Sequence, residues 1–251
     1  MKTIGLAAGY ATRLYPLTEN FPKPLLEIGH STILGRMLDD IDTIPDVDGH
    51  IIVTNGKFAD IFRRWAAERP SEPLAKPVKV LSDGTFTNET RLGAVRDLLL
   101  AIETFGLDED LLVVAADNIL DFSFKGFVEE FKRRGTSMIM CHHEPSVERL
   151  RRTGVIEVDD DFRVLQMQEK PQEPVSHWAV PPFYIYRKED LPLIKGAIDG
   201  GCGFDAPGNL AHYLVDRTVI HAWPMPAGRF DIDSLDTYEE AKRKYALNTE
   251  K

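Results

Sequence analysis

The chain has 251 residues, of which 43% are hydrophobic and 28% charged, as in a globular protein of one large domain or two small ones. Its formal net charge of −10 at pH 7 disfavours a nucleic-acid partner, since nucleic-acid-binding proteins usually present a basic face. No apolar run approaches the ~20 residues of a membrane helix and no secretory signal is visible, so we expect no membrane partner.

The first half of the chain alternates short apolar runs with amphipathic patterns. The apolar runs predict strands at 3–8, 50–55, 77–83, 110–118 and 136–143. Apolar residues at helical spacing predict helices at 32–44, 58–69, 88–106 and 124–135. Ser31 is the expected N-cap of the first helix, and Gly106 is expected to end the third. Strands that alternate with helices indicate a largely parallel sheet with helices on both faces.

The second half of the chain has a different order of predicted strands and helices. Residues 153–171 predict a hairpin with its turn at 159–161, and Pro181 and Pro182 lie near the start of one strand predicted at 179–189. The remaining predictions are helices at 190–198, 207–215 and 235–247 and strands at 219–225 and 229–232. Because no internal repeat or low-complexity linker is visible, we predict a single α/β domain over residues 1–251. Its central sheet is expected to be mixed and mostly parallel.

The segment that follows the first predicted strand has the features of an anion site. It lies at the carboxyl edge of the sheet, where open α/β sheets bind ligands. Small side chains, which let backbone N–H groups approach a phosphate, stand at Ala7, Ala8, Gly9 and Ala11. Arg13 adds a bidentate phosphate donor, and Lys23 is a compact charge between two prolines. These features suit a triphosphate, whereas the alternative interpretation is a surface loop with incidental charges.

Two other phosphate loops do not fit this chain. A Walker loop requires Ser or Thr where Phe58 stands, and a dinucleotide fingerprint requires an acid where the second strand ends in Asn55. Residues 6–29 instead resemble the signature of the sugar-1-phosphate nucleotidyltransferases, the glucose-1-phosphate thymidylyltransferase-like family. Its pattern is G-x-G-T-R-L-x-P-L-T followed by P-K-P. Ala11 replaces the second glycine, and this smallest replacement should preserve close approach to phosphate.

Two aspartates at distant strand ends are candidate metal ligands. The residues alone leave Asp117 open between a Mg²⁺ ligand and a cap of the next helix. The resemblance implies the metal, because the family has a metal-binding aspartate at this strand end. Residues 227–241 resemble W-x-D-I-G-T-P-E-D-Y, which places the second metal carboxylate at Asp231. Asp233 stands where a glycine is usual, and Asp236 is expected to begin the last helix.

The sequence Glu169-Lys170-Pro171 resembles the family motif that lies at the sugar side of the site. A Glu-Lys pair is by itself usually a solvated surface feature. In the family pattern E-K-P, the glutamate accepts hydrogen bonds from sugar hydroxyls and the lysine meets the sugar's phosphate. The stretch T-G-V-I-E-V similarly places Gly154 near the sugar.

Two departures from the family pattern leave the substrates open. Pro181 and Pro182 stand where a small polar residue and a glycine are common, so the usual hexose is not assumed. Residues 81–90 should read the base but lack the glutamine-proline pattern of the thymidylyltransferases. Gly93 is a weaker match to the family's G-x-A stretch, which offers backbone to the base.

A zinc site and a redox role are disfavoured. Alternation in a strand places Cys141 and His143 on one face, but no second ligand pair follows at a suitable spacing. The two cysteines, Cys141 and Cys202, form no metal or redox spacing, and we expect a reduced, cytoplasmic protein. Phe62 and Trp65 of the second helix are expected to pack in the core.

The resemblance implies a Rossmann-like nucleotidyltransferase fold with a nucleotide-binding part at about 1–120 and a sugar-phosphate-binding part at about 121–251. It implies Mg²⁺-dependent transfer of a nucleoside monophosphate from an NTP to a sugar 1-phosphate, with Arg13 and Lys23 as catalytic residues and Asp117 and Asp231 as metal ligands. The nucleotide-binding residues would be Leu6, Ala7, Ala8, Gly9, Ala11, Thr12, Gly93 and Asp117. The substrate-binding residues would be Asn118, Gly154, Glu169 and Lys170.

Two alternatives to this function stay open. The first is a cytidylyltransferase that uses a non-sugar phosphate such as phosphocholine, and the second is a non-catalytic nucleotide-binding module. The base, the acceptor, the pathway and any homo-oligomer cannot be read from the sequence.

Overall fold

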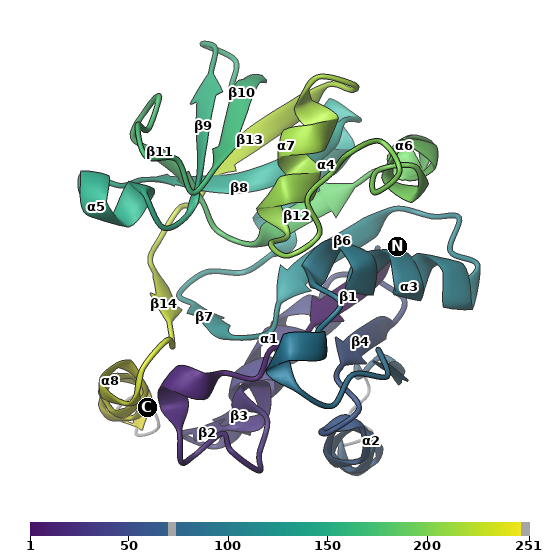
Figure 1. The fold of residues 1–251 in the computed structure, drawn as a ribbon, viewed down its shortest axis with the longest axis vertical. Helices are drawn as coiled ribbons and strands as arrows, with labels where there is room; N and C mark the ends of the chain where they lie inside the picture. Colours follow the sequence, from purple (N-terminus) through teal and green to yellow (C-terminus); the bar gives the residue numbers. More distant parts are fainter. Residues whose placement is uncertain (70–73, 247–251) are drawn as a thin grey trace. The chain divides into compact units, whose positions relative to one another are not determined.

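Ten strands form one mixed sheet in the computed structural model, which describes residues 1–69 and 74–246 (Figure 1). The strand order is β10-β9-β11-β8-β12-β6-β1-β4-β5, and β13 pairs with β8 outside this path. Helices flank the sheet, so the predicted α/β class is confirmed. No helix among the described residues is long and apolar enough to cross a membrane.

The chain divides into two compact units whose sequences interleave. The first unit contains residues 1–4, 92–114 and 126–226, and the second contains residues 5–91, 115–125 and 227–251. Strand β1 (Lys2–Leu6) begins in the first unit and ends in the second. The predicted binding residues are therefore distributed between two units.

The first unit is built on antiparallel pairs around β8, with one parallel pair between β13 and β8. Helix α7 lies against β10 (Figure 1). The strands are β6 (Leu111–Ala115), β8 (Ser137–His143), β9 (Gly154–Val158), β10 (Val164–Glu169), β11 (Trp178–Val180), β12 (Phe183–Tyr186) and β13 (Ile220–Pro224). The helices are α3 (Ala94–Phe105), α4 (Lys125–Arg134), α5 (Val147–Leu150), α6 (Leu191–Lys195) and α7 (Gly208–Val215), with a 3-10 turn at Lys188–Asp190.

The second unit combines a parallel pair, β4 with β5, and two short antiparallel pairs, β2 with β3 and β14 with β7. Its strands are β2 (Glu27–Ile28), β3 (Ser31–Thr32), β4 (His50–Thr54), β5 (Val78–Ser82), β7 (Asn118–Leu120) and β14 (Arg229–Asp231). Its helices are α1 (Ile33–Asp42), α2 (Ala59–Glu68) and α8 (Leu235–Ala246), with 3-10 turns at Thr12–Leu14, Lys23–Leu25 and Asn88–Thr90.

Two helix starts differ from the prediction. Thr32, not Ser31, caps α1, because its Oγ1 accepts a hydrogen bond from the amide of Gly35 at 2.9 Å. Helix α3 begins at Ala94 rather than near residue 88, since Gly93 has a φ of +92° that no helix can continue. The predicted ending at Gly106 is confirmed, with φ +58° in the left-handed region.

The predicted strand at 179–189 is in fact two strands. Pro181 and Pro182 separate β11 from β12, because proline has no amide hydrogen to continue a ladder. Strand β11 pairs with β8 and β9, whereas β12 pairs with β6 and β8. The hairpin predicted at 153–171 is confirmed as the antiparallel pair of β9 and β10.

Candidate active site

The loop that follows β1, residues 7–11, is held in place through its carbonyl groups. Asn55, just after β4, donates from Nδ2 to the carbonyl of Ala8 at 3.0 Å, and its Oδ1 accepts a backbone amide at the start of α2. Thr18 donates from Oγ1 to the carbonyl of Ala11 at 2.8 Å. Side chains from two later segments therefore fix the shape of this loop.

The backbone amides of this loop differ from its carbonyl groups in their hydrogen bonding. Within the ranges 1–69 and 74–246, no backbone amide from Ala8 to Arg13 donates a hydrogen bond to the protein. The exposed guanidinium of Arg13 has no ion-pair partner in the same described ranges. Unpaired amides in one short loop form the kind of cradle that binds a phosphate.

Ala11 has a backbone conformation that glycine usually adopts. Its φ of 46° and ψ of 44° lie in the left-handed region, which costs a non-glycine residue about 1–2 kcal/mol. Its methyl group packs against a buried cluster that includes Leu14 and Ile119. Ala11 therefore occupies a strained backbone position whose methyl group contributes to packing.

Five residues of the second unit form a continuous polar chain of hydrogen bonds and ion pairs. Lys23 Nζ lies 2.9 Å from Asp117 Oδ2, and Asn118 Nδ2 donates to Asp117 Oδ1 at 2.7 Å. Arg229 Nη1 donates to Asn118 Oδ1 at 2.5 Å and lies 3.3 Å from Asp231 Oδ2. The structure thus brings together Lys23, Asp117, Asn118 and Asp231, four of the predicted site residues.

Local strand pairing explains how the polar chain assembles. Strand β14 pairs antiparallel with β7, which sets Asp231 opposite Asn118 (Figure 1). Lys23, flanked by prolines in a 3-10 turn, has a side chain that is only 9% exposed. No helix begins after Asp117, since β7 follows directly, so its interpretation as a helix cap is wrong. Asp236, by contrast, lies in the first turn of α8 as predicted.

The charges in the polar chain influence one another. Desolvation, and next the charge of the Asp117 carboxylate, raise the pKa of Asp231 above its ordinary value. Arg229 and Lys23 oppose this shift. Two carboxylates that repel each other in this way are an arrangement that a cation relieves.

Asp117 and Asp231 fit a divalent cation such as Mg²⁺ by their donor chemistry, because Mg²⁺ prefers carboxylate oxygens. In the part of the chain that the structure describes, no group of three or more His, Cys, Asp and Glu side chains forms a metal site. Further ligands would have to be phosphate and water oxygens, which Mg²⁺ commonly retains in nucleotide sites.

The first unit holds the other predicted carboxylate, Glu169 at the end of β10. Its side chain is only 15% exposed, and burial raises its pKa, with Lys170 and His212 opposing the shift. Among the described residues its oxygens accept no hydrogen bond, and the nearest cation is Lys170 Nζ at 4.0 Å. A buried carboxylate with unused acceptor capacity is suited to receive hydroxyl groups from a ligand.

Two glycines make room for the Glu169 carboxylate. A Cβ atom on Gly208, at the start of α7, would lie 2.0 Å from Glu169 Oε2. A Cβ atom on Gly154 would lie 3.4 Å from the same oxygen and 3.0 Å from Met167. Gly154 was predicted from the sequence and Gly208 was not.

Lys170 has an unusual backbone conformation for a lysine, with a φ of 50°. Its amide donates to the carbonyl of Thr153 at 3.0 Å, which joins the end of β10 to the segment before β9. Its side chain is about half exposed. A side chain that leaves the sheet at this turn remains available to a ligand.

Gly93 is required by packing within the first unit. A Cβ atom there would lie 2.5 Å from the carbonyl oxygen of Phe204. The first amides of α3 donate to the carbonyls of Phe204 and Asp205. This packing accounts for the glycine without a ligand, and the predicted contact with a base stays a prediction.

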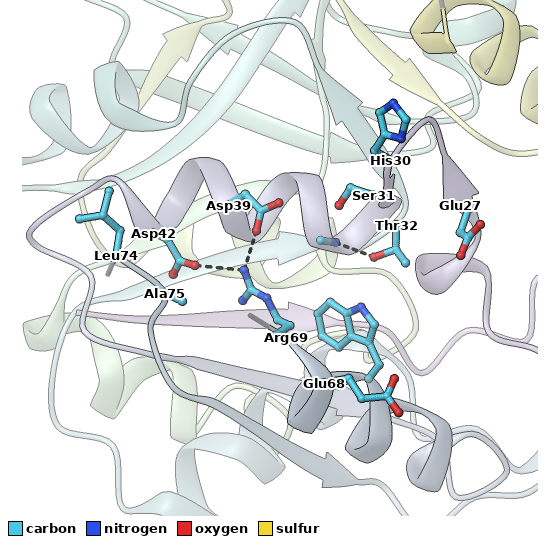
Figure 2. Close-up of a pocket in the computed structure, with 12 residues that line it drawn as sticks. Glu27, His30, Ser31, Thr32, Asp39, Asp42, Glu68, Arg69, Leu74 and Ala75 are labelled. Atoms are coloured by element: carbon cyan, nitrogen blue, oxygen red, sulfur yellow. Dashed lines mark hydrogen bonds and ion pairs between the residues drawn. The ribbon is translucent and has the colours of Figure 1, made fainter. Parts of the chain in front are cut away.

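A cavity of about 560 Å³ in the second unit contains none of the predicted site residues among those that line it. Figure 2 shows Arg69 donating hydrogen bonds to Asp39 and Asp42 beside this cavity. Trp65 also lines it and is only partly buried, so the prediction that it packs in the core is wrong, whereas Phe62 is fully buried. Trp65 lies under the Arg69 guanidinium, 5.7 Å from the ring centre.

Cys141 is a buried, unpaired thiol, and burial raises its pKa to about 12. His143 stacks on His177, with ring centres 5.5 Å apart. The neutral thiol is a poor metal ligand. These groups are accounted for by packing in the first unit.

With this geometry in view, comparison with known proteins gives a consistent result. The sequence profile described as "Nucleotidyl transferase" matches residues 2–203. The chain is 24% identical to the UTP–glucose-1-phosphate uridylyltransferase AglF of Haloferax volcanii, over 99% of this chain and 98% of that one. It is 30% identical to the glucose-1-phosphate thymidylyltransferase of Streptomyces antibioticus, over 79% of this chain and 51% of the relative.

A solved structure of a UDP-glucose pyrophosphorylase complexed with UDP-glucose superposes with a TM-score of 0.81 at 20% identity, covering 98% of each chain. This similarity shows a shared fold. The chain belongs to the nucleotidyl transferase family. The family named from the sequence signature, the sugar-1-phosphate nucleotidyltransferases, is confirmed, and with it the prediction of a transferase. The chain spans nearly all of the uridylyltransferase and about half of the thymidylyltransferase.

Sequence reasoning missed three residues that shape the site. Asn55 holds the loop at residues 7–11, and its only signal was its position at the end of a predicted strand. Gly208 makes space for Glu169, and the signal was a glycine that follows a proline at a helix start. Arg229 joins Asn118 to Asp231, and it stands where the family pattern W-x-D has its tryptophan.

Proposed function

We propose that this protein transfers a nucleoside monophosphate from an NTP to a sugar 1-phosphate, with Mg²⁺, and releases pyrophosphate. One observation carries the proposal: Lys23 is buried beside the Asp117–Asp231 pair in the unit that also holds the loop of unpaired amides. A site for a metal-bound triphosphate requires these three elements, and a surface loop with incidental charges requires none of them.

The chemistry follows from the charges of the reactants. A phosphate oxygen of the acceptor attacks the α-phosphorus of the NTP, and the bond from that phosphorus to the oxygen of the leaving pyrophosphate breaks. The acceptor phosphate is already ionised at pH 7, so the step needs no general base. Catalysis then consists of positioning and of neutralising anions that repel each other.

Each predicted residue has a role in this proposal. Lys23 stabilises the α-phosphate as charge develops on it, and Arg13 holds the departing phosphates. Asp117 and Asp231 would hold Mg²⁺, which when bound neutralises phosphate oxygens. Glu169 accepts sugar hydroxyls, and Lys170 guides the acceptor phosphate. Gly93, Asn118 and Gly154 are further contacts, and the nucleotide is bound by the residues at the end of β1 and in the segment that follows it, Leu6, Ala7, Ala8, Gly9, Ala11 and Thr12.

Pyrophosphate release tests the proposal. The assay combines five NTPs, namely ATP, CTP, GTP, UTP and dTTP, with several sugar 1-phosphates and with phosphocholine. Release that depends on a sugar 1-phosphate supports the proposed function. Release with CTP and phosphocholine alone would favour the non-sugar cytidylyltransferase, and nucleotide binding without any release would favour a regulatory module.

A double variant tests the metal pair in the same assay. Asp117→Asn with Asp231→Asn keeps the side-chain size and removes both negative charges. We expect Mg²⁺-dependent release to be lost, since two amides bind the cation poorly. Full activity in the double variant would reject the assignment of the two aspartates.

A further inference from the structure

Arg229 is a cation built into the predicted metal site. Its side chain is only 19% exposed, and its Nη1 contacts both Asn118 Oδ1 at 2.5 Å and Asp231 Oδ2 at 3.3 Å. Asn118 is 2% exposed and also donates to Asp117. The guanidinium is therefore connected to both carboxylates, directly to one and through a buried amide to the other.

The backbone and the last helix hold Arg229 in this position. Arg229 pairs with Leu120 in the ladder of β14 and β7. The amide of Asp121 donates to the carbonyl of Gly228 at 3.0 Å, and the Asp121 carboxylate accepts hydrogen bonds from Tyr245 and Lys244 of α8. The position of the guanidinium is thus part of the fold of the second unit.

The charges of the polar chain add up to a neutral group. Asp117 is paired with Lys23 at 2.9 Å, and Asp231 is paired with Arg229 at 3.3 Å. Each carboxylate that could hold a cation already has a positive partner. A divalent ion entering this group gains attraction from two carboxylates and repulsion from two cations, so little net electrostatic attraction remains.

We propose that Arg229 is a counter-cation that keeps the Asp117–Asp231 pair from binding a divalent metal until a nucleotide brings its own negative charge. This inference rests on the proposed function, because it assumes that the two aspartates are the metal ligands. The NTP phosphates supply the charge that the polar chain lacks, and the metal then binds together with the nucleotide. Loading of the metal is thereby made dependent on the substrate.

Mn²⁺ binding without nucleotide tests this inference. Free Mn²⁺ is measured by electron paramagnetic resonance during titration of the full chain, so the readout is independent of activity. Removing the charge with Arg229→Gln should lower the dissociation constant for Mn²⁺ about tenfold, because one repelling charge near the ion is lost. With a non-hydrolysable NTP analogue present, the difference between variant and wild type should shrink to less than about threefold.

Matched variants make the result specific. Arg63→Gln removes the same charge from an exposed pair with Asp60 in the same unit, and it should bind Mn²⁺ as the wild type does. Arg229→Lys keeps the charge and should also resemble the wild type. If Arg229→Gln does not fold, Arg229→Trp removes the charge with the residue of the family pattern and should show the same tighter binding.

Equal Mn²⁺ affinity in the wild type, Arg229→Gln and Arg229→Trp would overturn the inference while leaving the proposed function intact. A wrong assignment of the two aspartates as metal ligands would give a different result in the Mn²⁺ titration. If Asp117→Asn with Asp231→Asn does not weaken Mn²⁺ binding in the presence of the analogue, the assignment of the ligands fails, and the inference fails with it.

Discussion

The predicted acidic residues of the two units differ in the hydrogen bonds that their carboxylates accept. In the second unit, Asp117 and Asp231 are each paired with a cation, and Asn118 links them. In the first unit, Glu169 is buried with no hydrogen bond to its carboxylate among the described residues, and its pKa is raised by burial. The paired acids suit a ligand that arrives with its own charge. An acid whose carboxylate accepts no hydrogen bond from the described residues suits hydroxyl groups, which donate hydrogen bonds and carry no charge.

The largest expected effect comes from removing Lys23, the cation that is paired with Asp117 in the second unit. Lys23→Ala removes the cation that we propose acts on the α-phosphate, and it leaves Asp117 without its ion-pair partner. We expect turnover in the pyrophosphate assay to fall by on the order of 10²–10³, the usual loss for one donor that acts on the transition state. Lys242→Ala, which removes an exposed lysine of the same unit paired with Glu239, serves as the control and should keep full turnover. Near-unchanged turnover in Lys23→Ala would remove the catalytic role from this residue.

A smaller effect is expected when the Glu169 carboxylate of the first unit is displaced. Gly208→Ala places a methyl group 2.0 Å from Glu169 Oε2, so the carboxylate has to move. The KM for the acceptor should rise on the order of 10-fold, because a shift of about 1 Å disrupts positioning. Gly196→Ala is the matched control in the same unit, since its nearest neighbour would lie at an ordinary 3.7 Å. An unchanged KM in Gly208→Ala would show that Glu169 does not contact the acceptor.

Neutralising Glu169 separates its stability cost from its function. Glu169→Gln removes a buried charge and should raise the free energy of unfolding at pH 7 by about 1 kcal/mol while weakening acceptor binding. Because the pKa is raised in the folded state, the wild type loses stability as the pH rises through the ordinary value of 4.5 and up to the raised value. The advantage of the variant should therefore disappear below pH 4.5, as measured by urea denaturation. Glu157→Gln, at an exposed position of β9, is the control and should change the free energy of unfolding at pH 7 by less than about 0.5 kcal/mol.

Features that depend on local sequence could be predicted in this molecule, whereas contacts between distant segments could not. Strands and helices follow from local patterns, and the long family signature indicated that Lys23 and Asp117 lie together, so these features could be predicted. The hydrogen bond from Arg229 to Asn118 could not, because it depends on pairing between β7 and β14, which are far apart in sequence. Gly208 was missed for the same reason, since its neighbour Glu169 belongs to a different element.

The smallest expected effect is at Ala11, where opposing energies nearly cancel. Glycine would relieve a left-handed conformation that costs alanine about 1–2 kcal/mol. It would also add about 0.5–1 kcal/mol of unfolded-state entropy and lose the packing of a partly buried methyl group. We therefore expect Ala11→Gly to change the free energy of unfolding by less than about 0.5 kcal/mol, with turnover unchanged. Ala8→Gly, at a position without positive φ, lacks the relief and should lose about 0.5–1 kcal/mol in the same denaturation experiment. A larger loss in Ala11→Gly than in Ala8→Gly would mean that the methyl contact, and not the backbone conformation, determines the residue at this position.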